Sequence, residues 1–285
     1  MQSFFNKIKL VWTDSTLRRR VLFVFAALVV FRLLAAIPIP GIDNIALTRF
    51  LSNNQFFGIL NIFAGGGLTN LSIIMLGVGP YITGSIIMQL LTIMVPALKK
   101  IYHEEGEAGR KRFTQYGRLL TVPLAAIQGF TLLAVLESQS ILINLTVFDR
   151  ITNLFIVIAG SILLMWLGEL VSEFGIGNGV SLIIFAGIVS QLPSEVSQLI
   201  FTFDASQIPL YLIFAVIGVV VIAGIVLVTE AERPIPVTYA KRVRGMKMYG
   251  GGSTYLPLRV NQAGVIPIIF ALSILLFPQM IGTFL

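Results

Sequence analysis

The sequence predicts an all-α fold, a bundle of helices that crosses a membrane several times. Hydrophobic residues make up 56% of the 285 residues and charged residues only 12%, whereas a soluble domain usually carries about 45–50% and about 25%. Seven apolar segments are long enough to cross a hydrocarbon core, which takes roughly 20 residues. Most of the basic residues gather in three regions outside these segments. Together these observations exclude an ordinary cytosolic enzyme, a disordered chain and a coiled coil.

The seven predicted spans are residues 21–37, 77–98, 119–136, 154–171, 180–192, 208–228 and 263–285. The fifth is short unless it is extended back through the glycines at 175–179, where we expect a tight turn that lets two helices pack closely. Residues 56–76 are apolar at their edges but interrupted by three consecutive glycines. Such backbone needs protein or water around it, so we expect a short helix that enters without crossing. A flexible loop followed by a kinked helix is the alternative.

The basic residues determine the predicted orientation. The N-terminal arm, the segment after the second span and the segment after the sixth span hold 17 of the 20 basic residues. The opposite side has only Arg49 and Arg150. Cytoplasmic loops are enriched in Lys and Arg, so the N-terminus is predicted to be cytoplasmic. The first apolar run lacks a small-residue cleavage site, and we predict a multi-pass protein of the plasma membrane, bacterial because other targeting signals are absent.

Two of the basic segments invite a functional interpretation. Residues 229–262 carry six basic residues and the β-favouring stretches 234–240 and 253–260. We expect these stretches to pair as a hairpin whose tip, around residues 244–247, meets RNA phosphate or an acidic protein surface. A solvated loop that merely follows the distribution of positive charge is the alternative. Residues 99–118, which mix glutamates with arginines and lysine, are expected to form a second loop with the same two interpretations.

The chain offers no candidate for catalysis, for a metal or for a cofactor. It has no cysteine, and its one histidine, His103, lies among glutamates. No phosphate-binding, zinc-protease or nucleophile-elbow motif occurs. No span carries a set of acidic residues that would relay protons or bind sodium. Within the spans, we expect Arg32 to snorkel or to pair inside the bundle, and Gln89 and Gln128 to form interhelical hydrogen bonds.

Eight stretches of the sequence closely resemble the bacterial SecY family, the channel subunit of the protein-secretion translocon. Among them are EEGEAGRKRFTQYGR at 104–118, GIGNGVSLIIFAGI at 175–188 and LPLRVNQAGVIPIIF at 256–270. The family folds into ten helices in two pseudo-symmetric halves around an hourglass pore. The resemblance implies that residues 1–192 form the first half, with helices 1–5, and that residues 193–285 begin the second, with helices 6 and 7 and the cytosolic loop 229–262. Three family helices lie beyond the matched part.

The resemblance also implies the residues of the pore. The plug, a short helix that blocks the pore from outside, corresponds to about residues 56–76. Within it we single out Leu60, Asn61, Ile62, Phe63, Ala64, Gly65, Gly66 and Gly67. The pore ring corresponds to Val78, Ile82, Val180, Ile184 and Ile269. The spacing of four within each of the first two pairs places both members on one helical face. A ring of branched apolar side chains excludes ions by dewetting and offers a translocating chain no strong binding site.

A lateral gate and a docking surface are implied in the same way. The gate lies between the second and seventh spans, with the third beside it, and its polar positions are Thr83, Gln89 and Gln128. Apolar signal sequences leave through this gate into lipid. The cytosolic docking surface for the ribosome and the SecA motor corresponds to Lys241, Arg242, Arg244 and Lys247, together with Arg110, Lys111 and Arg112.

These features predict a passive, partner-driven channel for polypeptides. It translocates unfolded secretory chains and releases membrane-protein helices into the bilayer. The implied partners are SecE-type and SecG-type small membrane subunits, the SecA motor ATPase, the ribosome, signal sequences and nascent polypeptides, and lipid. The alternative is a small-molecule secondary transporter, which also commonly uses inverted repeats and broken helices, but the spans lack its acidic residues. An intramembrane protease would need a nucleophile–base pair, which the sequence does not supply.

Overall fold

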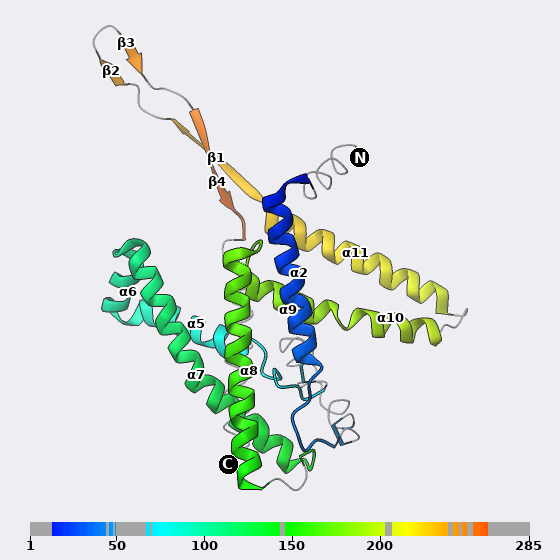
Figure 1. Ribbon diagram of the computed structural model, residues 1–285. Coiled ribbons are helices and arrows are strands. Elements are labelled where there is room, and N and C mark those ends of the chain that lie inside the picture. The colour runs from blue at the N-terminus through cyan, green and yellow to red at the C-terminus, as the bar shows by residue number, and fades with distance from the viewer. Residues whose placement is uncertain are drawn as a thin grey trace. The chain divides into compact units, whose positions relative to one another are not determined.

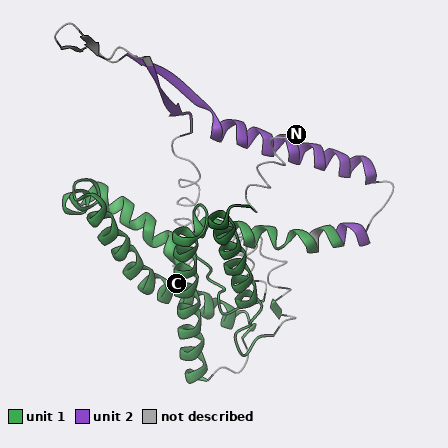
Figure 2. Cartoon of the chain, turned by 45° about the horizontal axis from the view of Figure 1, so that its top comes forward, with its two compact units in different colours: residues 1–197, 276–285 green, residues 198–275 purple. Residues whose placement is uncertain are grey.

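The computed structural model describes residues 13–43, 46–47, 49, 67–68, 70–142, 146–202, 207–238, 242–244, 247–249 and 253–261. The chain divides into two compact units, residues 1–197 with 276–285, and residues 198–275 (Figure 2). The division into two pseudo-symmetric halves at residue 192 stays a prediction.

The described residues are mostly helical, and the predicted all-α membrane bundle is confirmed. The helices, labelled in Figure 1, are α2 (Ser15–Ala35), α5 (Gly79–Met94), α6 (Pro96–His103), α7 (Gly106–Ser138), α8 (Val147–Phe174), α9 (Gly179–Val189), α10 (Leu192–Phe201) and α11 (Ile208–Glu230). Four helical stretches in the described part are long and apolar enough to cross a membrane, namely α7, α8, Gly179–Phe201 and α11. The pair α5 and α6, bent by 109°, makes a fifth if it counts as one span. Helix α2 is not among them because its 21 residues include four arginines.

The segment predicted as a loop at 99–118 is helical, so that prediction was wrong. Helix α5 ends at Met94 because the proline at position 96 forces Val95 into an extended conformation, with φ −112° and ψ 106°. Helix α6 then folds back on α7, where an added Cβ on Gly109 would lie 2.0 Å from the Ile101 carbonyl oxygen. The charge of this segment does not by itself distinguish a helical hairpin from a loop, and the close approach of Gly109 to the Ile101 carbonyl cannot be seen in the sequence.

Helix α8 begins earlier than its apolar run. Thr146 and Asp149 form a capping box, in which each side chain accepts a hydrogen bond from the other residue's backbone N–H. Such reciprocal bonds satisfy two donors that the first helical turn leaves unpaired. The predicted span at 154–171 is therefore the apolar centre of a helix of 28 residues.

The glycine-rich turn between α8 and α9 confirms the prediction that two helices pack closely there. Gly177 adopts a left-handed φ of 75°, which glycine tolerates without strain. The Asn178 side chain caps α9 by accepting a hydrogen bond from Ser181 N at 3.0 Å. An added Cβ on Gly179 would lie 2.0 Å from the Gly168 carbonyl oxygen. The two backbones therefore approach as closely as glycine permits.

Replacing Gly179 with alanine is expected to lower the stability of the α8–α9 pair. Because the new methyl group would overlap the Gly168 carbonyl, the helices must separate, and such overpacking costs about 1–3 kcal/mol. The melting temperature of the purified protein in detergent should fall. Gly218→Ala in α11 is the control, since nothing lies within 4 Å of its added Cβ. Equal melting temperatures for the two variants would contradict the close approach.

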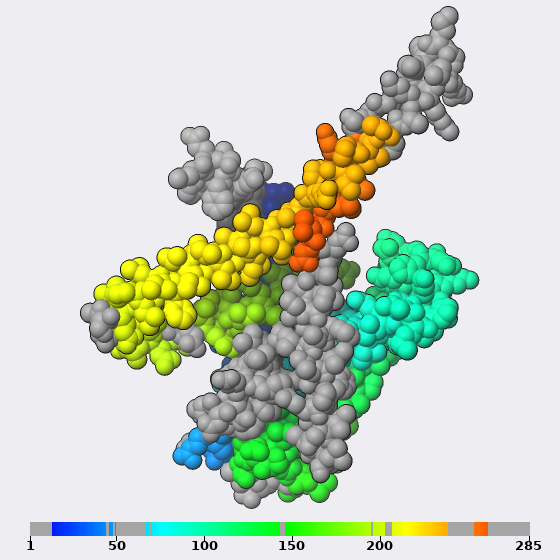
Figure 3. Space-filling model, turned by 180° about the vertical axis from the view of Figure 1, so that it is seen from behind, coloured from blue at the N-terminus to red at the C-terminus, as the bar shows by residue number. Residues whose placement is uncertain are grey.

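The second unit contains α11 and the predicted hairpin, which is confirmed. Strand β1 (Glu232–Thr238) pairs antiparallel with β4 (Ser253–Arg259), and β2 (Arg242–Arg244) pairs with β3 (Lys247–Tyr249). The register places Arg244 opposite Lys247 at the tip. Figure 3 shows α11 in yellow and the β1–β4 pair in orange. No described residue of α11 is buried.

Candidate pore constriction and docking surfaces

Four of the five predicted pore-ring residues lie in one apolar cluster. Val78 and Ile82 come from the start of α5, and Val180 and Ile184 from the start of α9. Val78 is 1% exposed, and the other three are half-buried. We call these four residues the α5–α9 cluster. The fifth predicted member, Ile269, lies outside the described residues.

The two helices present their cluster residues in the same way. Val78 is the N-cap of α5, and its carbonyl accepts the hydrogen bond from Ile82 N at 3.0 Å. Val180 is the second residue of α9, and Ile184 follows one turn later. Each pair therefore lies on a single face at the beginning of a helix. Buried side chains from other helices, Phe31, Ala35 and Leu164 among them, pack against this cluster.

A buried polar contact lies next to the α5–α9 cluster, where the Ser161 hydroxyl donates to the Gly77 carbonyl at 3.1 Å. The four side chains of the cluster itself are branched and aliphatic, and the apolar residues packed with them are aliphatic or aromatic. Such a surface supplies no ligand for an ion and no directional partner for a peptide group. It fits a constriction that resists water and ions while it holds a passing chain only weakly.

The predicted gate residues lie on two helices that pack directly against each other. An added Cβ on Gly84 of α5 would lie 3.3 Å from the Gly117 carbonyl oxygen of α7. Thr83 is buried, and its hydroxyl donates to the Gly79 carbonyl at 3.0 Å. Gln89 is exposed on α5 and Gln128 half-buried on α7. Among the described residues neither amide side chain forms the interhelical hydrogen bond that the sequence suggested.

Of the two outcomes predicted for Arg32, snorkelling or pairing inside the bundle, the structure shows a pair, but at an exposed contact. Its guanidinium donates to the Ser190 hydroxyl at 3.1 Å, and so connects α2 to the end of α9. A second polar link, not predicted from the sequence, joins Arg118 of α7 to Glu169 of α8, whose Nε and Oε1 atoms are 2.6 Å apart. Both residues lie near the predicted ends of spans, and opposite charges at such positions are the signal that could have indicated the pair.

The basic residues predicted to dock partners lie on two separate elements. Arg110, Lys111 and Arg112 are exposed in the first turns of α7. Arg112 forms a long ion pair with Glu105, 3.5 Å between Nη1 and Oε2. Arg242 and Arg244 belong to β2 and Lys247 begins β3, while Lys241 lies outside the described residues.

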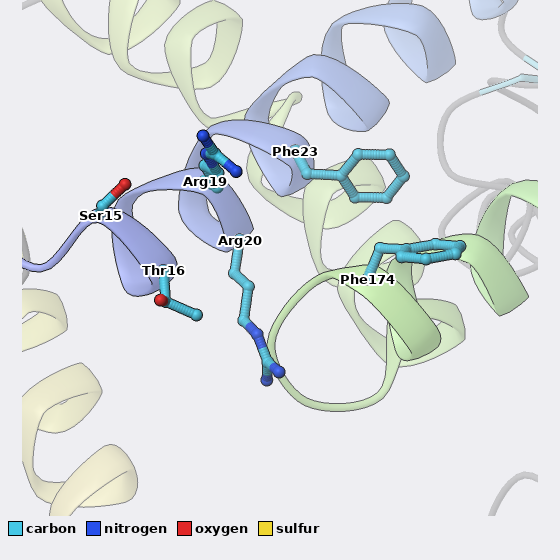
Figure 4. A pocket seen from close by; sticks show the side chains of 6 residues that line it. All are labelled: Ser15, Thr16, Arg19, Arg20, Phe23 and Phe174. Atoms are coloured by element: carbon cyan, nitrogen blue, oxygen red, sulfur yellow. The ribbon is translucent and has the colours of Figure 1, made fainter.

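A basic cavity of about 520 Å³ lies between the start of α2 and the end of α8 (Figure 4). Arg19 and Arg20 line it on one side. Phe23 and Phe174, whose ring centroids lie 5.9 Å apart in an edge-to-face arrangement, line the other. From the sequence, these arginines were expected only to orient the chain in the membrane. The signal that could have indicated the cavity is the run of arginines with an aromatic residue, Phe23, one turn after Arg19 and Arg20.

Most of the predicted plug residues lie outside the described part of the chain, namely Leu60, Asn61, Ile62, Phe63, Ala64, Gly65 and Gly66. Gly67 is described and buried. Its carbonyl accepts hydrogen bonds from the Ser72 backbone N at 2.8 Å and from the Ser72 hydroxyl at 3.1 Å.

The fold and sequence match those of known translocon proteins. The chain is 41% identical over 281 residues to the protein translocase subunit SecY of Corynebacterium glutamicum, covering 94% of this chain and 63% of that protein. It is 43% identical to the SecY subunit of Streptomyces galbus, with 94% and 64% covered. The chain thus spans less than two thirds of the length of these curated relatives.

Solved structures show the same fold at lower identity. A structure described as "The structure of a protein conducting channel" matches with a TM-score of 0.62 and 22% identity, over 94% of this chain and 59% of that one. "Sec61 in the Canine ribosome-channel complex from the endoplasmic reticulum" matches with a TM-score of 0.59 and 22% identity, over 94% and 59%. The family model SecY matches residues 72–285, more than half of the chain. The chain belongs to the SecY family.

Proposed function

We propose that this chain forms part of the central subunit of a protein-conducting channel in the bacterial plasma membrane. The channel translocates unfolded secretory polypeptides and releases membrane-protein helices sideways into lipid. The observation that carries this proposal is the α5–α9 cluster, in which four branched apolar residues from two helix starts lie in or against one group of buried apolar side chains. The proposal draws further support from relatives called protein translocase subunits.

The proposed constriction works because its side chains offer no polar groups that would bind a substrate. A transporter site holds its substrate with a few converging polar groups, whereas a channel for many different polypeptides must bind none of them strongly. The side chains of the ring make only dispersion contacts with a passing chain. The ring consists of Val78, Ile82, Val180 and Ile184, together with Ile269. When no chain is present, water leaves such a narrow apolar neck and ions are excluded.

The plug and the gate complete the proposed cycle. The plug, about residues 56–76, seals the external side, and a chain entering the pore displaces it. The gate, with Thr83, Gln89 and Gln128 on its polar side, lets an apolar signal sequence reach lipid. The direct packing of α5 on α7 supports a common gate wall for these three residues.

Partners supply the driving force, because the chain offers no motif for energy conversion. The SecA motor and the ribosome dock on the hairpin tip and on the start of α7, where basic residues gather. SecE-type and SecG-type subunits cover the outside of the bundle. The apolar surface of α11, unburied in the described part of the chain, faces lipid or such partners.

Reconstitution of the complete channel complex in lipid vesicles tests the proposed function. With SecA and ATP outside, an unfolded secretory precursor should become protected from added protease, and vesicles without the complex should protect none. Uptake of small solutes in place of polypeptide would instead support the transporter. The ion pair that holds Glu169 against Arg118 argues against that alternative, because it occupies a carboxylate within α8.

A further inference from the structure

Most of the described residues in the segment that leads into α5, residues 67–78, are buried. We call it the pre-α5 segment. Its side chains with no exposed surface are those of Leu68, Leu71, Ser72, Ile74 and Met75. Val78, at its end, is the first member of the α5–α9 cluster.

The segment lies at the seam between two apolar clusters. Leu68, Leu71 and Met75 belong to a cluster with Leu136 of α7 and Val157 of α8. Ile74 and Val78 belong to the cluster that contains the predicted pore ring. Moving the segment would therefore open both clusters and expose apolar surface on both sides.

Backbone hydrogen bonds tie the segment to the chain that follows α2. Ile39 N donates to the Leu71 carbonyl at 2.9 Å, and Ile73 N donates to the Ile37 carbonyl at 3.0 Å. These two bonds flank an antiparallel bridge between Pro38 and Ser72. In an antiparallel ladder, a pair flanked in this way is the closely spaced type, with Cα atoms about 4.5 Å apart.

Helix α8 anchors the other side of the segment through two neighbouring residues. An added Cβ on Gly160 would lie 2.0 Å from the Ile73 carbonyl oxygen, so the backbone of the segment rests directly on the helix. The Ser161 hydroxyl donates to the Gly77 carbonyl at 3.1 Å, and this contact is buried. Gly77 directly precedes Val78, so this hydrogen bond fixes the peptide unit that carries the first ring residue.

The backbone of the segment is also strained. Leu71 has a φ of 42°, in the left-handed region that favours glycine. A buried leucine keeps such a conformation only where its surroundings determine it strongly. The strain is consistent with a segment that is held from several sides.

From these contacts we infer that the pre-α5 segment stays fixed on α8 while the channel opens, and that Gly160 and Ser161 are positioning residues for the constriction. The inference rests on the proposed function, since it takes Val78 as part of the pore ring. It also divides the predicted plug, because residues 67–76 then remain in place when the rest is displaced.

A disulfide between positions 38 and 72 tests whether the segment must move. The chain has no cysteine, and a Cα separation of about 4.5 Å lies within the range of disulfides. The complete complex with Pro38→Cys and Ser72→Cys should form the bond on oxidation, seen as loss of maleimide labelling. Translocation by the oxidised complex should stay within about twofold of the reduced one. The single-cysteine variants are the controls. Failure to form the bond, or a block that reductant reverses, would overturn the inference.

Ion leak through the resting complex tests the two positioning residues. Ser161→Ala, which removes the donor to Gly77, and Gly160→Ala, which displaces the Ile73 carbonyl, should each raise the leak, by about fivefold or more. Gly129→Ala is the matched control, since its added Cβ meets only side-chain atoms at 3.4 Å or beyond. Ser161→Thr keeps the hydroxyl and should restore the seal. If Gly160→Ala fails to assemble, the serine variants still decide the question.

The leak of Ile82→Gly separates this inference from the function on which it rests. If Ile82→Gly leaks and the α8 variants remain tight, the constriction stands and its anchoring by α8 is refuted. If Ile82→Gly also remains tight, the assignment of the pore ring itself fails.

Discussion

A channel with glycine at positions 82 and 184 is expected to conduct ions in its resting state at least about tenfold better than the unmodified channel. A tenfold change in rate corresponds to about 1.4 kcal/mol off the barrier. Ile82 and Ile184 belong to two different helices and pack against the same group of buried apolar side chains. Their removal widens the apolar neck from both sides, and a wider neck holds water more readily and so admits ions.

Conductance across a planar bilayer that contains the complete complex measures this effect. The matched control is Ile93→Gly, which makes the same chemical change on α5 at a side chain that is 80% exposed. Each glycine placed in a helix costs about 1 kcal/mol, in the double variant and in the control alike. The control therefore distinguishes the effect of a weakened helix on conductance from the effect of a widened neck. Equal conductance of the double variant and the control, with both complexes intact, would remove these residues from the pore ring.

Reversing the charge at the hairpin tip is expected to weaken docking of the ribosome or SecA. The variant Arg244→Glu with Lys247→Glu alters the two residues that the strand register places opposite each other. If the tip meets phosphate or carboxylate groups, like charges then face one another across the interface, which costs several kcal/mol. We expect the Kd to rise by about tenfold or more, with membrane insertion of the chain unchanged.

Co-sedimentation with ribosomes, and binding of SecA to the reconstituted complex, measure this change at several salt concentrations. The affinity of the unmodified protein should fall with salt, and that of the variant should fall less steeply because fewer counterions are released. Arg233→Glu with Arg259→Glu makes the same change in net charge at the other end of the hairpin, where both residues belong to the β1–β4 pair. If both variants weaken docking equally, or if neither weakens it, the tip is only a solvated loop.

The sequence predicted this hairpin but not the helical hairpin of α6 and α7, and the difference has a physical cause. Strands β1 and β4 contain β-branched, aromatic and proline residues that disfavour a helix. Residues 99–118 are rich in charge, and charge alone does not separate a solvated helix from a loop. The contact of Gly109 with the Ile101 carbonyl involves a glycine and a backbone group, neither of which contributes to apolar periodicity.

The interhelical partners of polar residues were predicted with mixed success for a related reason. Arg32 had to find a partner or reach water, since an unpaired charge within a span is costly, and it donates to Ser190. Gln89 carries no charge and is exposed on α5. An amide tolerates several environments, so composition did not determine its partner.

By itself, the sequence determined the class of the protein, its apolar helices and the asymmetry of its basic charge, because each of these depends on residue type summed over long windows. It also determined membership of the SecY family through motifs of ten or more residues. Only the tertiary structure decided how the residues before α5 are held. Ser161 and Gly77, which form one of the contacts, are 84 positions apart in the sequence. The sequence around a glycine in an apolar helix looks the same whether that glycine faces lipid or, like Gly160, the backbone of another segment. Close packing between distant residues depends on the shape of the whole bundle, which no local pattern encodes.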